Sequence, residues 1–231
     1  MDLETQAQIY LADQRGISQV GFFRSFHTFN FGHYFHESRT PFVNLQVFND
    51  DTLKAGHRLK LKLEKNSEVI IIPIVGGLEF HNSLETGFLE VGQVQIFSAL
   101  AATEYEIINP YETEEINFLQ IWLNNDSVDF TSKIEVNAFD FEDKNTMLPI
   151  FSKNSQRGFI GKYDGRKKEE FTFEKSENDI FFFVLSGAFE VQDRLLHTRD
   201  GLSLSNFKMI DFEALSNDAI ILMFELVLQP Q

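Results

Sequence analysis

The sequence predicts an all-β protein made of two antiparallel β-barrels in tandem. Three observations support this fold class: hydrophobic residues alternate with polar ones or gather in short runs, helical periodicity is nearly absent, and a barrel-sized segment is repeated. Alternation is typical of a strand with one buried face. A short run rich in Ile and Val is typical of a strand buried on both faces.

The internal repeat is the strongest of these observations. The apolar stretch that begins at Glu68 matches, without a gap, a stretch that begins 111 residues later at Asp179. A second pair of stretches, which begin at Ile116 and Ile221, lies 105 residues apart. A solenoid repeat would return every few tens of residues, so this spacing indicates a duplicated domain.

The predicted domains are residues 1–135 and 136–231, and length and composition agree with two of them. A chain of 231 residues with 43% hydrophobic residues is sufficient for two small cores, and most of its 26 Phe are expected inside the barrels. The linker is expected in the polar, acidic stretch 124–143. Residues 133–136 and 138–141 each favour an additional strand there.

The strands of the first half can be placed one by one. A short apolar stretch, an aromatic stretch, a strictly alternating stretch, an Ile-rich run and two later apolar stretches predict strands at residues 8–11, 21–35, 59–64, 69–75, 93–97 and 116–123. The only helical feature expected is a turn near residues 100–105.

Charge and composition exclude several classes of function. The chain carries 35 acidic and 20 basic residues, a net charge of −15, which disfavours direct nucleic-acid or membrane partners. The basic run at 166–168 is followed at once by Glu169 and Glu170, so we interpret it as a solvated turn. Without cysteine there are no disulfides and no thiolate chemistry. The N-terminal residues lack a signal-peptide pattern and no stretch predicts a membrane span, so a cytoplasmic protein is expected.

Two histidines lie in the aromatic stretch of the first half. His27 and His33 are possible metal ligands. Histidines in such a strand more often serve as hydrogen-bonded parts of the core, and we interpret both in this way.

Several short motifs, in order along nearly the whole chain, resemble the pirin family of bicupins. They include Phe26-His27-Thr28-Phe29-Asn30-Phe31, Asn49-Asp50-Asp51, Ala55-Gly56, Asn109-Pro110 and Gln120-Ile121-Trp122. The resemblance implies a bicupin fold of two jelly-roll barrels, which the duplicated strands would build. The resemblance also implies two kinds of activity, because some pirin relatives cleave quercetin with a metal and others associate with protein partners.

The metal ligands that the resemblance implies are replaced in this chain. Pirin-like proteins hold a metal in the first barrel with a His-x-His pair, a third His and a Glu, and these positions fall on Lys62, Glu64, Tyr105 and Ile107. A protonated lysine and an isoleucine offer no lone pair to a metal. We therefore expect no cofactor. Iron or another divalent metal is expected only if the site has relocated.

A relocated metal site would need other residues near the first barrel. His57, His81 and Glu106 are the candidates. His57 is an odd number of residues from Lys62 and Glu64, so it faces the other side of the same strand. His81 lies beyond the Gly76-Gly77 turn, so a relocated site is not favoured.

The alternation at residues 59–64 leaves the orientation of the strand open. In one register Leu59, Leu61 and Leu63 fill the barrel and the charged residues face water; in the other, Lys62 and Glu64 point inward. The gapless match to the family favours the second register, in which Lys62, Glu64 and Tyr105 would form a metal-free polar pocket.

Three functions follow as hypotheses. The first is a bicupin without catalysis that binds an unidentified small molecule or protein. The second is a metal-dependent dioxygenase of the quercetinase type with a relocated metal site. The third is a regulatory protein that acts through protein partners.

Overall fold

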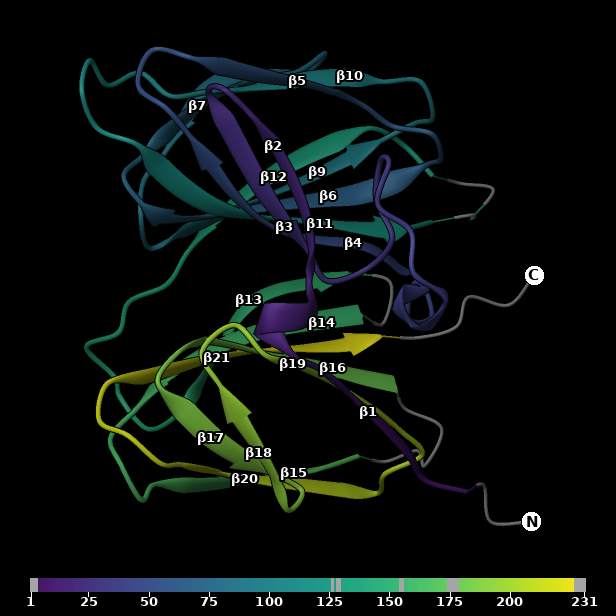
Figure 1. Cartoon of the computed structure of the whole chain (residues 1–231), viewed down its shortest axis with the longest axis vertical. Helices are drawn as coiled ribbons and strands as arrows, with labels where there is room; N and C mark the ends of the chain where they lie inside the picture. The colour runs from purple at the N-terminus through teal and green to yellow at the C-terminus, as the bar shows by residue number, and fades with distance from the viewer. Residues whose placement is uncertain (1–3, 126, 128–129, 154–155, 174–178, 227–231) are drawn as a thin grey trace. The chain divides into compact units, whose positions relative to one another are not determined.

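The computed structural model describes residues 4–125, 127, 130–153, 156–173 and 179–226. These residues form two compact units, each a β-barrel of two sheets (Figure 1). The N-terminal barrel comprises residues 15–138, and the C-terminal barrel comprises residues 139–226 together with 4–14. The described residues contain no α-helix and only two single-turn 3-10 helices, so none of their helices reaches the length of a membrane span.

The N-terminal barrel pairs a seven-stranded sheet with a four-stranded sheet, both antiparallel. The larger sheet has the order β12-β9-β6-β11-β4-β3-β2 and the smaller the order β5-β10-β7-β8. In chain order the elements are β2 (Gly16–Val20), β3 (Phe23–His27), η2 (Glu37–Arg39), β4 (Leu45–Leu53), β5 (Arg58–Lys62), β6 (Ser67–Val75), β7 (Leu78–His81), β8 (Thr86–Leu89), β9 (Gln93–Ala99), β10 (Glu104–Ile108), β11 (Ile116–Asn124) and β12 (Lys133–Ala138).

The C-terminal barrel repeats this plan. Its larger sheet has the order β1-β19-β16-β21-β14-β13 and its smaller sheet the order β15-β20-β17-β18. The elements are β1 (Gln6–Tyr10), η1 (Ala12–Gln14), β13 (Met147–Lys153), β14 (Gln156–Tyr163), β15 (Lys168–Thr172), β16 (Asp179–Ser186), β17 (Ala188–Val191), β18 (Arg194–His197), β19 (Gly201–Ser205), β20 (Met209–Ala214) and β21 (Ala219–Leu226).

The two sheet orders confirm the duplication predicted from the sequence. Strands β9-β6-β11-β4 of the first barrel occupy the same places as β19-β16-β21-β14 of the second, and the two small sheets correspond strand by strand. The repeated stretches at Glu68 and Asp179 are the buried central strands β6 and β16. The all-β bicupin fold is therefore confirmed.

The predicted domain boundary is wrong at the N-terminus. Strand β1 pairs along its length with β19 of the C-terminal barrel, and Figure 1 shows this purple strand among the strands of that barrel. Tyr10 is 3% exposed with its ring 5.9 Å from that of Phe181, and the Ala12 N–H donates to Asp200 Oδ1 at 2.7 Å. Alternation reveals that residues 6–10 form a strand, but it does not reveal which sheet they join.

Strand β12 plays the corresponding part in the first barrel. It lies inside the predicted linker and pairs with β9, just as β1 pairs with β19. The additional strand expected at residues 133–136 is therefore present, whereas residues 139–141 form none. Each barrel is thus completed by an edge strand from a segment that connects or precedes the duplicated halves.

Two further expectations need correction. The aromatic stretch 21–35 forms a strand only over Phe23–His27, because the chain then reverses at Gly32, whose φ of +58° suits glycine. The helical turn expected near residues 100–105 is a non-helical turn at Ala101 and Ala102 that leads into β10.

Candidate functional site

Strand β5 settles the open question of register. Lys62 and Glu64 are exposed, whereas Leu63 is 1% exposed and belongs to the core of the barrel. The two other leucines, Leu59 and Leu61, are half-buried and pack against that core. The predicted inward orientation of Lys62 and Glu64 is therefore wrong, because burying three leucines is favourable while burying two charges is not.

The residues that face the interior along β5 and β10 are almost entirely apolar. Tyr105 pairs with Leu61 and Ile107 pairs with Leu59 across the two strands. Ile107 is fully buried and Tyr105 is 5% exposed. Of the four, only Tyr105 carries a polar group.

The Tyr105 hydroxyl belongs to a buried hydrogen-bonded chain and not to a pocket with Lys62 and Glu64. It donates to Gln120 Oε1 at 3.0 Å and accepts from Trp122 Nε1 at 2.9 Å. Burial raises the pKa of this phenol well above its ordinary value, so the hydroxyl stays neutral. It positions the Trp122 indole.

These residues do not fit the metal that the family resemblance implies. Leu59, Leu61 and Ile107 have no donor atom, and the Tyr105 hydroxyl is already engaged. Across the described ranges, no three His, Cys, Asp or Glu side chains lie close enough to share a metal ion. That the purified protein holds no metal stays a prediction.

Among the described residues, those considered for a relocated site do not form a group of three potential ligands. The His57 ring stacks on Phe22 with centroids 4.9 Å apart, and its Nδ1 bonds the Ala55 carbonyl. His81 is half-buried in β7, opposite Glu106 of β10, on the outer side of the small sheet. A relocated site at these residues has no support in the geometry.

His27 is a hydrogen-bonded part of the core, as predicted. Its Nε2 lies 2.8 Å from Ser18 Oγ, and its Nδ1 lies 2.9 Å from Asn49 Oδ1. Burial lowers the pKa of this imidazole, the hydrogen bond with Asn49 raises it, and the charge of Arg15 lowers it further. A neutral ring is therefore favoured at physiological pH. The same interpretation is wrong for His33, which is exposed in the loop after β3.

Asp50 and Asp51 are adjacent in β4 but face opposite sides of the sheet. Asp50 forms an ion pair with Arg15 at 3.2 Å and accepts from Asn117 Nδ2 at 2.7 Å. Asp51 is fully buried, and neither carboxyl oxygen has a hydrogen bond of ordinary geometry with a described residue.

The unpaired burial of Asp51 changes its ionisation. Burial raises the pKa of this carboxyl to about 8, a weak interaction with the Ser25 hydroxyl lowers it, and the charge of Asp50 raises it. Asp51 therefore carries a proton at neutral pH. The interior of the N-terminal barrel keeps a neutral polar group where a charge would be costly.

A pocket of about 570 Å³ opens beside this polar interior. Aromatic side chains form much of its wall: Phe31, Tyr34, Phe35 and Trp122. Trp122 is 7% exposed, whereas Phe35 is 74% exposed at the rim. Lys62 and Glu64, which do not point into the barrel, line the pocket from its exposed side together with Lys65.

The aromatic loop, residues 30–36, is held in place by its own hydrogen bonds. Asn30 uses its side chain to accept from the His36 N–H at 2.8 Å and to donate to the His36 carbonyl at 3.1 Å. Phe31 and Tyr34 bond each other through their backbones. A Cβ on Gly16 would lie 2.3 Å from the Tyr34 ring, so only glycine leaves room for that ring.

This pocket is not among the sites predicted from the sequence. Residues 28–35 are predicted as part of a strand, in which an aromatic residue fills the core. The turn-forming residues Asn30 and Gly32, which lie between the aromatic residues, are the signal that a loop begins there.

Comparison with known proteins agrees with the fold and the resemblance. Residues 153–226 match the family model described as the quercetinase C-terminal cupin domain. A quercetin 2,3-dioxygenase of Escherichia coli K12 is 25% identical over 230 residues, which cover 94% of this chain and 98% of that protein.

Solved structures with the same fold cover nearly the whole chain. The crystal structure of YhhW from Escherichia coli has a TM-score of 0.86 at 21% identity and covers 98% of this chain and 100% of its own. The bacterial pirin YhhW in complex with nickel(II) has a TM-score of 0.85 at 22% identity, covering 96% and 99%. Taken with the motifs along the sequence, these similarities support the resemblance to the pirin family, and the structures share the bicupin fold of this chain.

Proposed function

We propose that this protein is a pirin-like bicupin without a working metal centre, which binds a small molecule in the pocket of its N-terminal barrel and does not cleave it. The observation that carries the proposal is the ladder of β5 and β10, where Leu59, Leu61 and Ile107 face the interior. Oxygen chemistry of the quercetinase type needs a redox metal with open coordination positions. This ladder supplies no ligands for one.

The pocket supports binding of a small molecule. Its volume lies within the range of about 300–1,000 Å³ that is usual for small-molecule sites. Its aromatic walls provide flat apolar surface, while Gln46 and Asn124, already bonded to each other at 3.1 Å, place polar groups at its edge. A fixed loop and a fixed Trp122 reduce the entropy lost on binding.

Quercetin cleavage is the second candidate, because curated relatives carry that name. Under this alternative the protein would acquire a metal at residues other than the replaced family ligands. Elemental analysis and oxygen uptake separate the two candidates directly.

The test uses the sole tryptophan of the chain as its reporter. Trp122 lines the pocket, so a bound aromatic molecule should quench or shift its emission. We expect quercetin or another flat aromatic probe to change this emission, with well below one metal per chain and no oxygen uptake after addition of iron(II) or nickel(II). Oxygen uptake above background would establish the second candidate instead.

A matched pair of variants locates the binding. Phe35→Ala should weaken binding of the probe without unfolding the barrel, because the Phe35 ring is 74% exposed. Phe88→Ala, on β8 and 46% exposed but outside the pocket, should leave binding unchanged. If no aromatic probe alters Trp122 emission, the pocket is not a binding site.

A further inference from the structure

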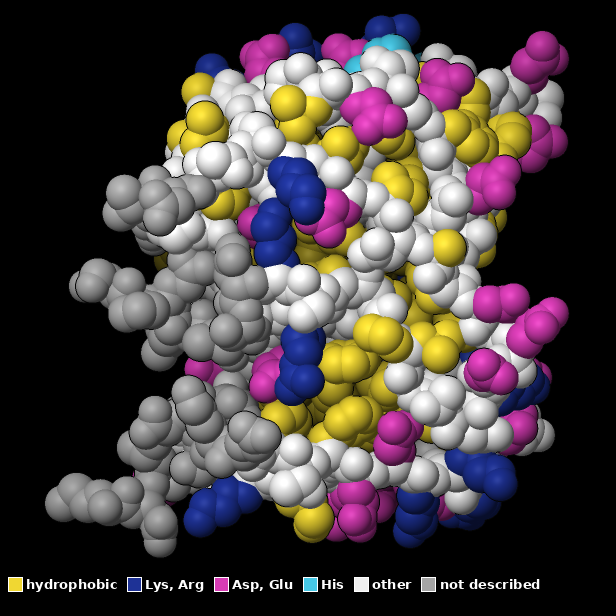
Figure 2. All heavy atoms as spheres, turned by 180° about the vertical axis from the view of Figure 1, so that it is seen from behind, with side chains coloured by type: hydrophobic (Ala, Val, Ile, Leu, Met, Phe, Trp, Pro, Cys, Tyr) yellow, Lys and Arg dark blue, Asp and Glu magenta, His cyan; other side chains and the backbone are white. Residues whose placement is uncertain are grey.

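The rim of the pocket carries a local positive charge in a strongly acidic protein. Its charged lining residues are Lys62, Glu64 and Lys65, a formal balance of one positive charge. The chain as a whole carries −15, and acidic side chains are spread widely over the face shown in Figure 2. The acidic surface repels an anion, so an anion approaches more easily at such a small cationic site than elsewhere.

The two rim lysines are available to a ligand. Neither Lys62 nor Lys65 forms an ion pair with a carboxylate among the described residues. Their neighbour Lys60, two residues before Lys62 on β5, shows the usual alternative, because its ammonium lies 2.8 Å from Glu104 on the adjacent strand. The pocket therefore borders on two ammonium groups that form no such close pair with a described carboxylate, and the third lysine of the same stretch is neutralised. The hydrogen bond from Lys60 lowers the pKa of the Glu104 carboxyl most, and the charge of Lys62, which lies opposite Glu104 in the strand register, contributes to this lowering.

The aromatic lining of the pocket favours an aromatic ring in the ligand. Phe31 contacts Trp122 edge to face with centroids 5.5 Å apart, and Phe35 stands 74% exposed at the rim. The loop that carries Phe35 is held by hydrogen bonds, so the ring stays in contact with water. Covering the ring with an apolar surface would be favourable. A flat aromatic ligand would cover it.

We infer that the ligand of this pocket is a flat aromatic molecule that carries an anionic group, with its ring against Phe31, Phe35 and Trp122 and its anion at Lys62 and Lys65. The inference rests on the proposed function, since it specifies the ligand class of the same pocket. An aryl carboxylate is the simplest member of this class. Glu64 restrains the affinity, because its carboxylate repels the same anion.

The experiment compares biphenyl-4-carboxylate with its neutral isostere biphenyl-4-carboxamide, each titrated into the full-length protein and followed by Trp122 emission and by calorimetry. We expect the carboxylate to bind about five- to tenfold more tightly at low ionic strength. This preference should shrink in high salt, because the rim charges are exposed.

Three variants test the assignment of charges. The double variant Lys62→Gln/Lys65→Gln should bind both probes equally, and Glu64→Gln should strengthen binding of the carboxylate only. The control Lys54→Gln, at an exposed position outside the pocket lining, should change binding of neither probe. All lie at exposed positions, so the fold should be retained. Equal binding of the two probes to the unchanged protein would overturn the inference while leaving the proposed function standing. Binding of neither probe would overturn both.

Discussion

The two barrels share one strand plan but differ in where they place polar side chains. The interior of the C-terminal barrel is packed with aromatic rings, among them Phe182, Phe189 and Phe212. In the corresponding interior of the N-terminal barrel, Asp51 and His27 are buried among apolar residues. The same backbone therefore supports one interior built for packing and another that retains polar groups.

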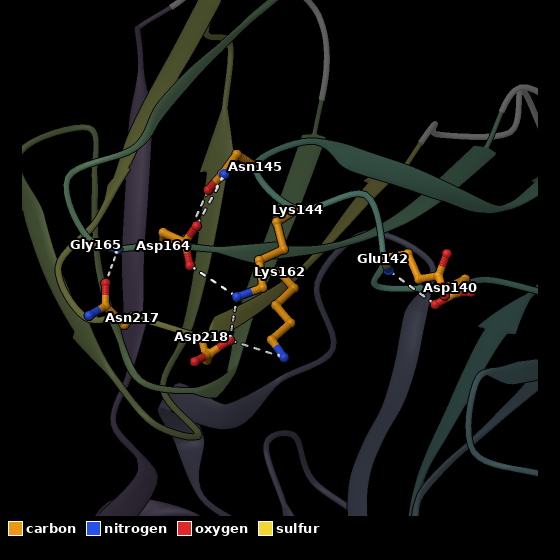
Figure 3. A network of polar contacts seen from close by, with 9 residues as sticks. All are labelled: Asp140, Glu142, Lys144, Asn145, Lys162, Asp164, Gly165, Asn217 and Asp218. Atoms are coloured by element: carbon orange, nitrogen blue, oxygen red, sulfur yellow. Dashed lines mark hydrogen bonds and ion pairs between the residues drawn. The ribbon is translucent and has the colours of Figure 1, made fainter.

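The polar network of the C-terminal barrel lies instead at its surface. Figure 3 shows Lys144 between Asp164 and Asp218, with Nζ–Oδ1 distances of 3.1 and 2.8 Å. Lys162 reaches Asp218 as well, at 3.1 Å. The two halves of the duplication thus differ in that the N-terminal barrel buries polar groups, while the C-terminal barrel buries mainly aromatic rings and keeps this network exposed.

The largest effect is expected from the aromatic interior of the C-terminal barrel. The Phe212 ring lies 5.1 Å from that of Tyr163 and 5.9 Å from that of Phe189. Phe212→Ala should lower the free energy of unfolding by about 3–5 kcal/mol, through lost burial and the cavity that remains. Chemical denaturation measures the loss, and hydrogen exchange of β16–β21 locates it.

Met209→Ala is the matched control on the same strand. Met209 is 49% exposed, so its truncation should change stability by less than about 0.5 kcal/mol. Similar losses for both variants would mean that the C-terminal barrel does not depend on its aromatic interior.

The polar interior of the N-terminal barrel should make stability depend on pH. Asp51 has a folded pKa of about 8 against an ordinary value of 3.8, so between these values the folded state holds a proton that the unfolded chain has released. Stability therefore falls as pH rises from about 4 to 8, by at most about 1.4 kcal/mol per pH unit. Asp51→Asn should flatten this decline in urea denaturation curves measured across that range.

Asp50→Asn provides the contrast from the neighbouring position. It removes the partner of Arg15 and should destabilise the barrel, yet leave the decline with pH in place. Parallel pH curves for the unchanged protein and Asp51→Asn would show that Asp51 is ionised in the folded state.

The strands and the duplication could be predicted from the sequence because they depend on local periodicity. The Ile-rich run of β6 and the Phe-rich run of β16 each identify a strand buried on both faces without any knowledge of its neighbours. The family spacing likewise predicts that the ligand positions are replaced, but of Lys62 and Ile107 only Ile107 faces the interior in the structure, because Lys62 is exposed.

What could not be predicted depends on contacts between distant segments. The alternation of β5 is equally compatible with either face inward, and only the core around Leu63 decides between them. The pocket required the loop after β3 to meet Trp122, which is about 90 residues away in the chain. Local periodicity predicts neither of these contacts.

The strand that pairs with β1 is the third feature that local alternation of residues does not determine. Tyr10 is the one buried residue of β1, packed on Phe181 of the C-terminal barrel. Tyr10→Ala should lower the free energy of unfolding by about 1.5–3 kcal/mol, the usual contribution of one buried large side chain. Hydrogen exchange should increase in β19.

The matched control is Ile9→Ala, on the same strand but 40% exposed, which should have a much smaller effect. Faster exchange in β9 of the N-terminal barrel, with β19 unchanged, would contradict the assignment of β1.

The smallest effect is expected from the surface network in Figure 3. Lys144 lowers the pKa values of Asp164 and Asp218 through hydrogen bonds, so its contribution is present above the ordinary carboxyl pKa and is lost as pH falls through the lowered values. Solvent and salt screen exposed pairs, so Lys144→Ala should change stability only slightly at neutral pH. Asp218 also retains Lys162 as a partner, which limits the loss.

Lys167→Ala is the control, since Lys167 forms no ion pair with a described carboxylate in the same barrel. The difference between the two variants should be small at low salt and should vanish at about 1 M salt, where the screening length is about 3 Å. A loss for Lys144→Ala as large as that for Phe212→Ala would contradict the contrast between the barrels, because the surface network would then stabilise the C-terminal barrel as much as its aromatic interior does.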